Sequence, residues 1–243
     1  MEDISLKAEE LFAIGGFGVT NSLLLTFIVF FTLILASFFI HKNIRIIPGA
    51  FQGTLEMGME WLLGLMEPML GSMKKAEQYF PLVATIFIFI MASNLSGILP
   101  GVGSLVVRHG GEEISLLRSP AADLNFTLAF AVISVMVTNI IGMSAVGVFA
   151  HLGKFLNFKN PILFFIGILE MVSEIAKIIS LSFRLFGNVF AGEVLLTIVA
   201  FLAPYIIPLP FLFLEMFVGL IQAFVFAMLT LVSIALHTAE HEH

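Results

Sequence analysis

One arginine in the middle of a long apolar run is the residue best placed to do chemistry in this sequence. Arg184 lies within SFRLFGN, residues 182–188. A charge at the centre of a membrane-spanning helix costs at least about 2.5–3.5 kcal/mol, so it marks a functional site by default. Arginine also cannot lose its proton to escape that cost. We therefore expect Arg184 to act on charge inside a membrane.

Other polar residues share a helical face with Arg184. At about 100° per residue, these residues fall within a stripe about 80° wide. The members of this polar stripe, besides Arg184, are Glu170, Glu174, Lys177 and Asn188. One alternative is that the charges simply pair and lock helices together, as Glu174 and Lys177 would at a spacing of three residues. Arg184 has no such local partner, because the nearest charge in its own helix is seven positions away.

Two further carboxylates lie beyond the polar stripe. Glu193 falls on another face of the helix, about 13 Å farther along the axis than Arg184. Glu215 and Gln222 share a face of the next segment, and Glu215 and Glu193 both lie close to the turn between the two segments. The two carboxylates are therefore expected to line one cavity. Carboxylates that approach a fixed positive charge from both ends are typical of two proton paths that must not join.

Composition places the chain among polytopic membrane proteins. Of 243 residues, 59% are hydrophobic and 12% are charged, and mean hydropathy is +1.08, far from the balance of a soluble domain. The absence of cysteine excludes disulfides, Cys-ligated zinc and iron–sulfur clusters. The acidic start lacks the features of a removable signal peptide, so we expect the first span to direct insertion. We expect no cofactor, no metal and no nucleic-acid partner, and the lipid bilayer as surroundings.

The elements that position these residues are expected to form an all-α fold in one membrane domain, residues 1–243, with about five membrane-embedded helices. An outer amino-terminal segment at 1–20 precedes a first span at 21–40 and an amphipathic surface helix at 51–71. Two spans joined by an outer polar loop occupy 80–149, and a long tilted hairpin forms the ion path at 161–237. Three prolines in residues 204–210 separate its arms. The first arm is about twice as long as a perpendicular span, so it must tilt, lie partly flat or break.

Lysine and arginine in short loops predict which side faces the cytoplasm. One side would carry Lys42, Arg45, Lys74, Lys75, Lys154 and Lys159, and the opposite side would carry Lys7, Arg108 and Arg118. We therefore expect the amino terminus outside and the carboxyl terminus in the cytoplasm. Glu170 and Glu174 would then lie toward the inner side, and Glu193 and Glu215 toward the outer side.

The run SLSFRLFGNVFAGE, residues 180–193, resembles the signature of subunit a of the F-type ATP synthase. Its arginine, asparagine and glutamate match the family at their spacing. Residues 94–100, NLSGILP, resemble the end of the family's second full span, and residues 122–128 resemble the start of the next. Residues 222–226 resemble the glutamine motif on the last helix. The resemblance covers nearly the whole chain. The motifs fit both bacterial and plastid members, and we favour the bacterial type. We therefore expect a multi-pass protein of the bacterial plasma membrane.

This resemblance implies a stator channel subunit that is not itself an enzyme. In the family, subunit a presses a tilted hairpin against a ring of c subunits, in a complex with the b-subunit peripheral stalk and the other ATP synthase subunits. A proton enters through an outer half-channel, loads a ring carboxylate, travels with the turning ring and leaves through an inner half-channel. Arg184 would separate the half-channels, with Asn188 and Gln222 beside it.

The resemblance also assigns the acidic residues. Glu193 and Glu215 would line the outer path. The inner path would be lined by Glu170, Glu174 and Ser173. Some bacterial members carry histidine where Glu215 stands, so proton transfer there would depend on carboxylates and water. Gly97 stands where some members carry aspartate, which weakens any role for that position.

Two other functions fit parts of the sequence. A secondary transporter would use Arg184 to bind an anionic substrate, but such transporters often show two similar halves, and this sequence shows no internal repeat. A membrane enzyme is suggested by the tail HTAEHEH, residues 237–243, whose side chains include metal ligands. Chain ends commonly fray, so we expect a solvated tail.

Overall fold

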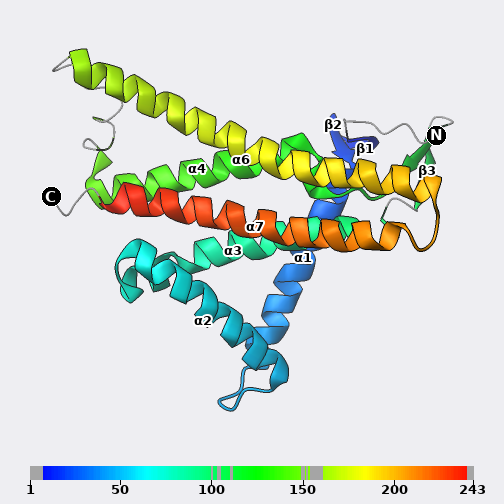
Figure 1. Cartoon of the computed structure of the whole chain (residues 1–243), viewed down its shortest axis with the longest axis horizontal. Helices are drawn as coiled ribbons and strands as arrows, with labels where there is room; N and C mark the ends of the chain where they lie inside the picture. Colours follow the sequence, from blue (N-terminus) through cyan, green and yellow to red (C-terminus); the bar gives the residue numbers. More distant parts are fainter. Residues whose placement is uncertain are drawn as a thin grey trace.

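Helices make up most of the chain, which is described here by a computed structural model for residues 8–99, 101–102, 105–109, 112–148, 151, 153 and 161–239. The long helices are α1 (Asn21–Lys42), α2 (Ala50–Leu70), α3 (Met73–Ile98), α4 (Leu124–Val146), α6 (Pro161–Leu202) and α7 (Pro208–Ala239) (Figure 1). Among the described residues, α1, α3, α4 and α7 are long and apolar enough to cross a membrane. The expected all-α membrane fold is confirmed, while α6 as a fifth embedded helix stays a prediction.

Two short β-hairpins lie in segments for which the sequence predicted only connections. In the first, β1 (Glu10–Ile14) pairs antiparallel with β2 (Phe17–Thr20). Gly15 and Gly16 form the turn with φ of +59° and +89°, the conformation that tight hairpin turns require. In the second, β3 (Val106–His109) pairs with β4 (Glu112–Ser115). Both hairpins lie toward the same end of the helical bundle (Figure 1).

The predicted carboxyl-terminal hairpin is present, and its first arm is continuous. Helix α6 runs without a break for 42 residues, about 63 Å at 1.5 Å per residue. The prolines act as expected, because Pro208 and Pro210 stand in the first turn of α7, where the missing N–H groups cost nothing. The two arms are adjacent at this turn, and α6 diverges from α7 toward its own start (Figure 1).

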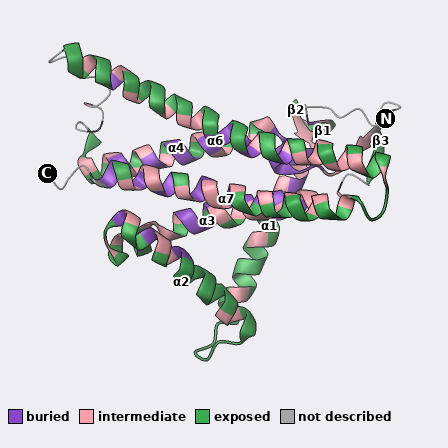
Figure 2. Cartoon of the chain, viewed as in Figure 1, coloured by how far each residue is buried: buried purple, intermediate pink, exposed green. Residues whose placement is uncertain are grey.

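Helix α7 lies between α3, α4 and α6 and supplies much of the core. Buried side chains from the facing surfaces include Ile90 of α3, Leu185 of α6 and Leu231 of α7. Burial is concentrated on these inner surfaces, and the outer surfaces are exposed (Figure 2). Exposed apolar outer surfaces are what lipid-facing helices require.

Polar side chains link the helices where their backbones approach. Asn94 Nδ2 of α3 donates to the Gly219 carbonyl of α7 over 2.8 Å, in a buried position. Ser134 of α4 bonds Thr230 of α7 at 2.8 Å between hydroxyl oxygens. Thr127 of α4 bonds Ser182 of α6 at 3.1 Å. Small residues and hydroxyl pairs of this kind are how membrane helices associate without a hydrophobic driving force.

Helix α2 is amphipathic, as its pattern predicted. Leu62, Met66 and Leu70 are buried, and Met66 is fully enclosed. Its three glutamates, Glu56, Glu60 and Glu67, are exposed. Helix α2 packs beside the start of α3, and its placement at the membrane surface stays a prediction.

Candidate functional site

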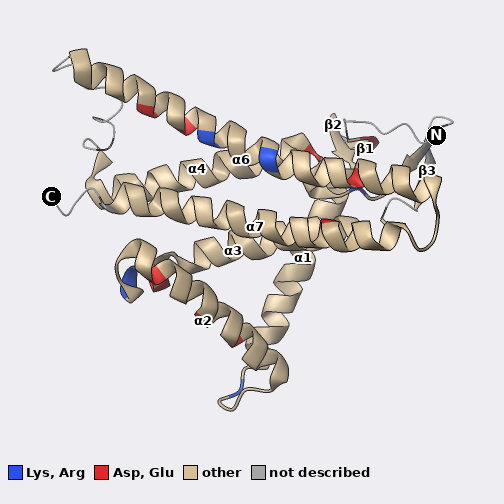
Figure 3. Ribbon diagram, viewed as in Figure 1, with Lys and Arg blue, Asp and Glu red and all other residues tan. Residues whose placement is uncertain are grey.

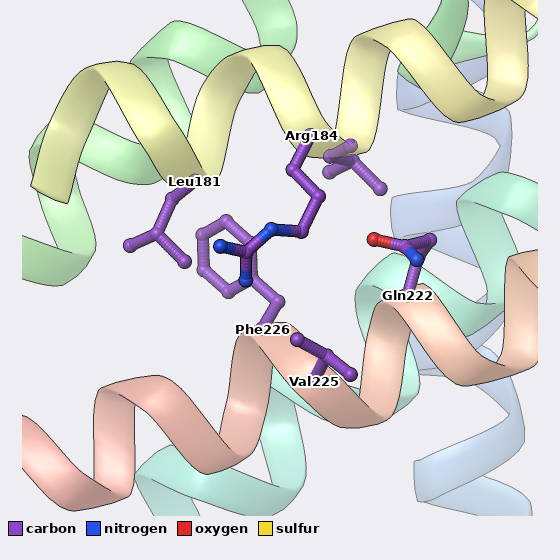
Figure 4. A pocket seen from close by; sticks show the side chains of 6 residues that line it. Leu181, Arg184, Gln222, Val225 and Phe226 are labelled. Atoms are coloured by element: carbon purple, nitrogen blue, oxygen red, sulfur yellow. The ribbon is translucent and has the colours of Figure 1, made fainter.

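Arg184 lies on the surface of α6 that faces α7. Its Nη2 donates to Ser180 Oγ, one turn earlier, over 3.2 Å in an exposed position. A small pocket between the helices is lined by Leu181, Arg184, Leu185, Gln222, Val225 and Phe226. Figure 4 shows the guanidinium extending from α6 toward Val225 and Phe226, with Gln222 on the same wall. The sequence-predicted pair Arg184 and Gln222 is therefore brought together from two helices.

No carboxylate pairs with Arg184 within the described part of the chain. Asn188, one turn further along α6, is exposed. Ser182, two residues before Arg184, instead points into the bundle and is fully buried. Among the described residues, the guanidinium is thus held at an open face of the hairpin by the Ser180 hydroxyl, with no carboxylate to neutralise its charge.

Charged residues are unevenly distributed among the long helices. Figure 3 shows charged positions spaced along α6, on α2 and at the start of α3, whereas α1, α4 and α7 are almost entirely uncharged. Helix α6 carries Glu170, Glu174, Lys177, Arg184 and Glu193. Within the hairpin, most of the charged groups therefore lie on α6 rather than on α7.

At the turn end of the hairpin, α6 and α7 bring two carboxylates into one region. Glu193 and Glu215 are both half-buried. A Cβ placed on Gly192 would lie 3.0 Å from Cδ of Glu215, so the Glu215 side chain crosses to α6 directly beside Glu193. Glycine leaves the space that this carboxyl group occupies.

An arginine that the sequence did not assign to the site joins this group. Arg118 Nε lies 3.8 Å from Glu193 Oε2, and the Arg118 side chain is 10% exposed. Arg118 precedes a short 3-10 helix, η1 (Pro120–Ala122), which packs against α6. The sequence placed Arg118 only in an outer loop, because 75 positions separate it from Glu193 and no local pattern connects them.

The acidic residues toward the other end of α6 have different surroundings. Glu174 Oε1 lies 2.6 Å from Lys177 Nζ, so the predicted alternative of a local ion pair is found for these two residues. Asn139 Nδ2 of α4 donates to Glu174 Oε2 over 3.2 Å. Glu170 is half-buried one turn earlier, and Ser173 is exposed.

Part of the carboxyl-terminal tail was predicted incorrectly. His237 and Thr238 are 4% and 8% exposed, because α7 continues to Ala239 and packs its last turns against α4. His237 Nε2 lies 3.7 Å from Glu174 Oε1. The expectation of a solvated tail is therefore wrong for these two residues, and residues 240–243 lie outside the described chain. Within the described residues, no group of three or more potential ligands could hold a metal ion.

Close packing explains why glycine stands at position 97, where some members of the resembled family carry aspartate. A Cβ at this position would lie 2.5 Å from Cβ of Ser119. The loop before η1 therefore occupies the space that an aspartate side chain would need.

The chain matches the family model described as ATP synthase A chain over residues 22–235, almost its entire length. The chain belongs to this family. The matched range includes Arg184, both carboxylates near the turn and the whole of the pocket between α6 and α7. The matched range contains all of α6 and most of α7, up to residue 235.

Relatives in this family match over most of their length. ATP synthase subunit a of Moorella thermoacetica is 35% identical over 230 residues, which is 95% of this chain and 96% of that protein. The subunit a of Campylobacter concisus is 32% identical over 216 residues, 87% of each chain. A subunit a of Pelobacter propionicus is 32% identical over 211 residues, 86% of this chain and 83% of that protein.

Proposed function

We propose that this chain is the proton-conducting stator subunit of a rotary F-type ATP synthase, in which Arg184 separates two offset half-channels. The observation that carries the proposal is the position of Arg184. Its guanidinium lies at an open face of the α6–α7 hairpin, bonded to Ser180 but to no carboxylate in the described chain. Carboxylates lie on both sides of it along the hairpin.

The outer half-channel would end in the carboxylate group near the turn. Glu193 and Glu215 approach from α6 and α7, and both side chains are half-buried, so water and protein share their surroundings. Such groups can accept and pass on a proton from water. Arg118 contributes a positive charge 3.8 Å from Glu193.

The inner half-channel would run along the first half of α6. Glu170, Ser173 and Glu174 lie within about one turn of each other, and Glu174 is about 15 Å from Arg184 along the axis. Glu193 lies about 13 Å from Arg184 in the opposite direction. The two sets of carboxylates are too far apart to exchange a proton directly, because transfer needs a heavy-atom separation of about 3 Å or one bridging water.

Arg184 would act on the carboxylate of a neighbouring c subunit. A fixed guanidinium in a low-dielectric site favours the ionised form of a carboxyl group that approaches it. The ring carboxylate would therefore release its proton to the inner path as it reaches Arg184, and take up another from the outer path after passing it. The same charge repels a proton that would otherwise cross directly. Asn188 and Gln222 flank Arg184 and would orient the passing carboxylate.

The proposed setting follows from the family and from charge placement. The chain would be a non-catalytic subunit, with residues 161–237 as the ion path and the preceding helices as their support. Its partners would be the c-ring, the b-subunit peripheral stalk and the other subunits of the complex. It would lie in a bacterial plasma membrane with its amino terminus outside, and protonmotive force would supply about 2.3 kcal/mol per charge per 100 mV.

The test is ATP-driven proton pumping by inverted membrane vesicles that contain the complex with Arg184→Ala. Passive proton permeability is measured in parallel after the soluble ATPase sector is removed. We expect pumping to be lost while the complex stays assembled, and the passive leak to rise. Arg45→Ala is the matched control, because Arg45 is an exposed arginine in the turn after α1. Normal pumping with Arg184→Ala would overturn the proposal.

A further inference from the structure

A buried cluster of titratable side chains lies where the last turns of α7 meet α4 and α6. His237 of α7 is 4% exposed and His151, which follows α4, is 2% exposed. His237 Nε2 lies 3.7 Å from Glu174 Oε1. The Asn139 amide contacts two members at once, because Nδ2 donates to Glu174 Oε2 over 3.2 Å and Oδ1 lies 3.1 Å from His151 Nε2. Asn139 of α4 and His237 of α7 therefore meet at the carboxylate of α6, and His151 joins the cluster through Asn139.

The backbone is shaped to accommodate the two imidazole rings. A Cβ on Gly142 of α4 would lie 2.9 Å from His151 Cε1 and 3.0 Å from His237 Cβ. Even alanine would crowd both residues at this position. The rings meet edge to face with centroids 5.4 Å apart. Asn139 lies one turn before Gly142 on α4, so the same helix both makes the space and holds the carboxylate.

We propose that Glu174 and His237 form a proton-exchange pair at the end of the inner half-channel, and that Asn139 and His151 position them. This inference rests on the proposed function and extends its inner path to a residue near the end of α7. The family resemblance gave roles to Glu170, Ser173 and Glu174 in this region and none to His237, His151 or Asn139.

The proposed step moves one proton between two side chains. Protonated Glu174 gives its carboxyl proton to Nε2 of neutral His237, which leaves a carboxylate and an imidazolium. The imidazolium then gives one proton to water beyond the end of α7, and His237 returns to its neutral form. The present distance of 3.7 Å exceeds the reach of direct transfer. A side-chain rotation that shortens it by about 0.5–1 Å, or one bridging water, completes the contact.

Neighbouring side chains fix the position of the Glu174 carboxyl group. Lys177 of the same helix lies 2.6 Å from Glu174 Oε1. Helix α4 contributes the uncharged Asn139 to Glu174, and His151 lies against the His237 ring. Glu174 is therefore held by groups from α6, α4 and α7 together, so its position is defined relative to His237.

A purely structural role predicts a different outcome. A buried ion pair that only ties α4, α6 and α7 together would affect assembly, but would leave the rate per assembled complex unchanged. A proton-exchange role would affect that rate and its dependence on pH at the inner side, because imidazoles change charge between about pH 5 and 8.

The deciding experiment measures proton pumping per assembled complex in inverted vesicles that carry His237→Gln, with the pH of the outside medium varied. In such vesicles this medium contacts the inner face of the complex. We expect the rate to fall by about 100-fold or more, since positioned acid–base groups contribute at least that much. The rate change between about pH 5 and 8 should also disappear. A normal rate with an unchanged pH profile would overturn the inference.

Chemical rescue keeps the inference testable if the glutamine variant assembles poorly. His237→Ala leaves a space the size of the ring near the end of α7, and added imidazole should restore at least part of the pumping rate. Failure of imidazole to raise the rate in assembled complexes counts against proton exchange. His41→Gln is the matched control, because His41 is an exposed histidine in the last turn of α1, and we expect no change.

The same vesicles separate this inference from the proposed function. Loss of pumping with Arg184→Ala, together with normal behaviour of His237→Gln, would overturn only the exchange pair. Normal pumping with Arg184→Ala would overturn the proposed function itself.

Discussion

Gly192 and Glu215 face each other across the hairpin, with only 3.0 Å between a Cβ built on the glycine and Cδ of the glutamate. The two residues come from different helices. The space beside Gly192 therefore decides where the Glu215 carboxyl group lies relative to Glu193.

Gly192→Ala should reduce proton pumping while leaving assembly intact. The added methyl group must displace the flexible end of Glu215 by a few tenths of an ångström. A misplacement of 1 Å can cost about 100-fold in rate, so we expect a loss of roughly three-fold or more here. Alanine is the better helix former by about 1 kcal/mol, so a loss of rate could not reflect a weaker helix. Gly58→Ala on α2, where a Cβ meets nothing within 4 Å, is the control and should pump normally.

Arg118 and Glu193 should act as one unit in transport. Their side chains lie 3.8 Å apart, and residues in contact give non-additive effects when both are changed. We expect Arg118→Gln and Glu193→Gln each to lower pumping, and the double variant to match the more severe single variant within about two-fold. Effects that multiply would show that the two residues act independently. Pumping rates per assembled complex for the four forms provide the measurement.

The sequence predicted the hairpin well because local rules determine it. Prolines mark both the start of α6 and the turn before α7, and the bounds agree with expectation within a few residues. The family resemblance, and not the polar stripe, put Gln222 beside Arg184, and both residues line one pocket. Helical periodicity and proline are short-range signals, so a single sequence carries them fully.

Features that depend on distant contacts were not predicted. Burial of His237 depends on the space that Gly142 leaves on a different helix, whereas the histidine- and glutamate-rich tail suggested exposure. The contact between Arg118 and Glu193 joins a loop to α6 and has no local signature. The sequence does contain a local signal for the first β-hairpin, because Gly15-Gly16 between two short apolar runs favours a tight turn. The two strands were not predicted, because the same uncharged run continues into α1 and suggests a helix.

Gln222→Leu should lower pumping without raising the passive proton leak. The change removes an amide from the pocket wall that Arg184 faces and keeps a similar volume. Loss of one polar interaction costs about 1 kcal/mol, which corresponds to roughly five-fold in rate. The leak should stay low because Arg184 remains in place. The matched control is Gln78→Leu, because Gln78 is an exposed glutamine near the start of α3. A raised leak with Gln222→Leu would contradict the assignment of the barrier to Arg184.

Asn94→Leu should destabilise the packing of α3 against α7 rather than block the proton path. Asn94 Nδ2 donates to the Gly219 carbonyl over 2.8 Å, and Cβ of Asn94 already lies 3.1 Å from a Cβ built on Gly219. Loss of such a bond between membrane helices costs about 0.6–2 kcal/mol, and the branched leucine side chain adds crowding at this close approach. We expect a lower thermal unfolding temperature for the detergent-solubilised complex, with a near-normal pumping rate per complex that remains assembled. Thr54→Ala is the control, because it removes an exposed hydroxyl bond within α2. It should leave the unfolding temperature unchanged. An equal decrease in both variants would show that the Asn94 bond does not specifically hold α3 to α7.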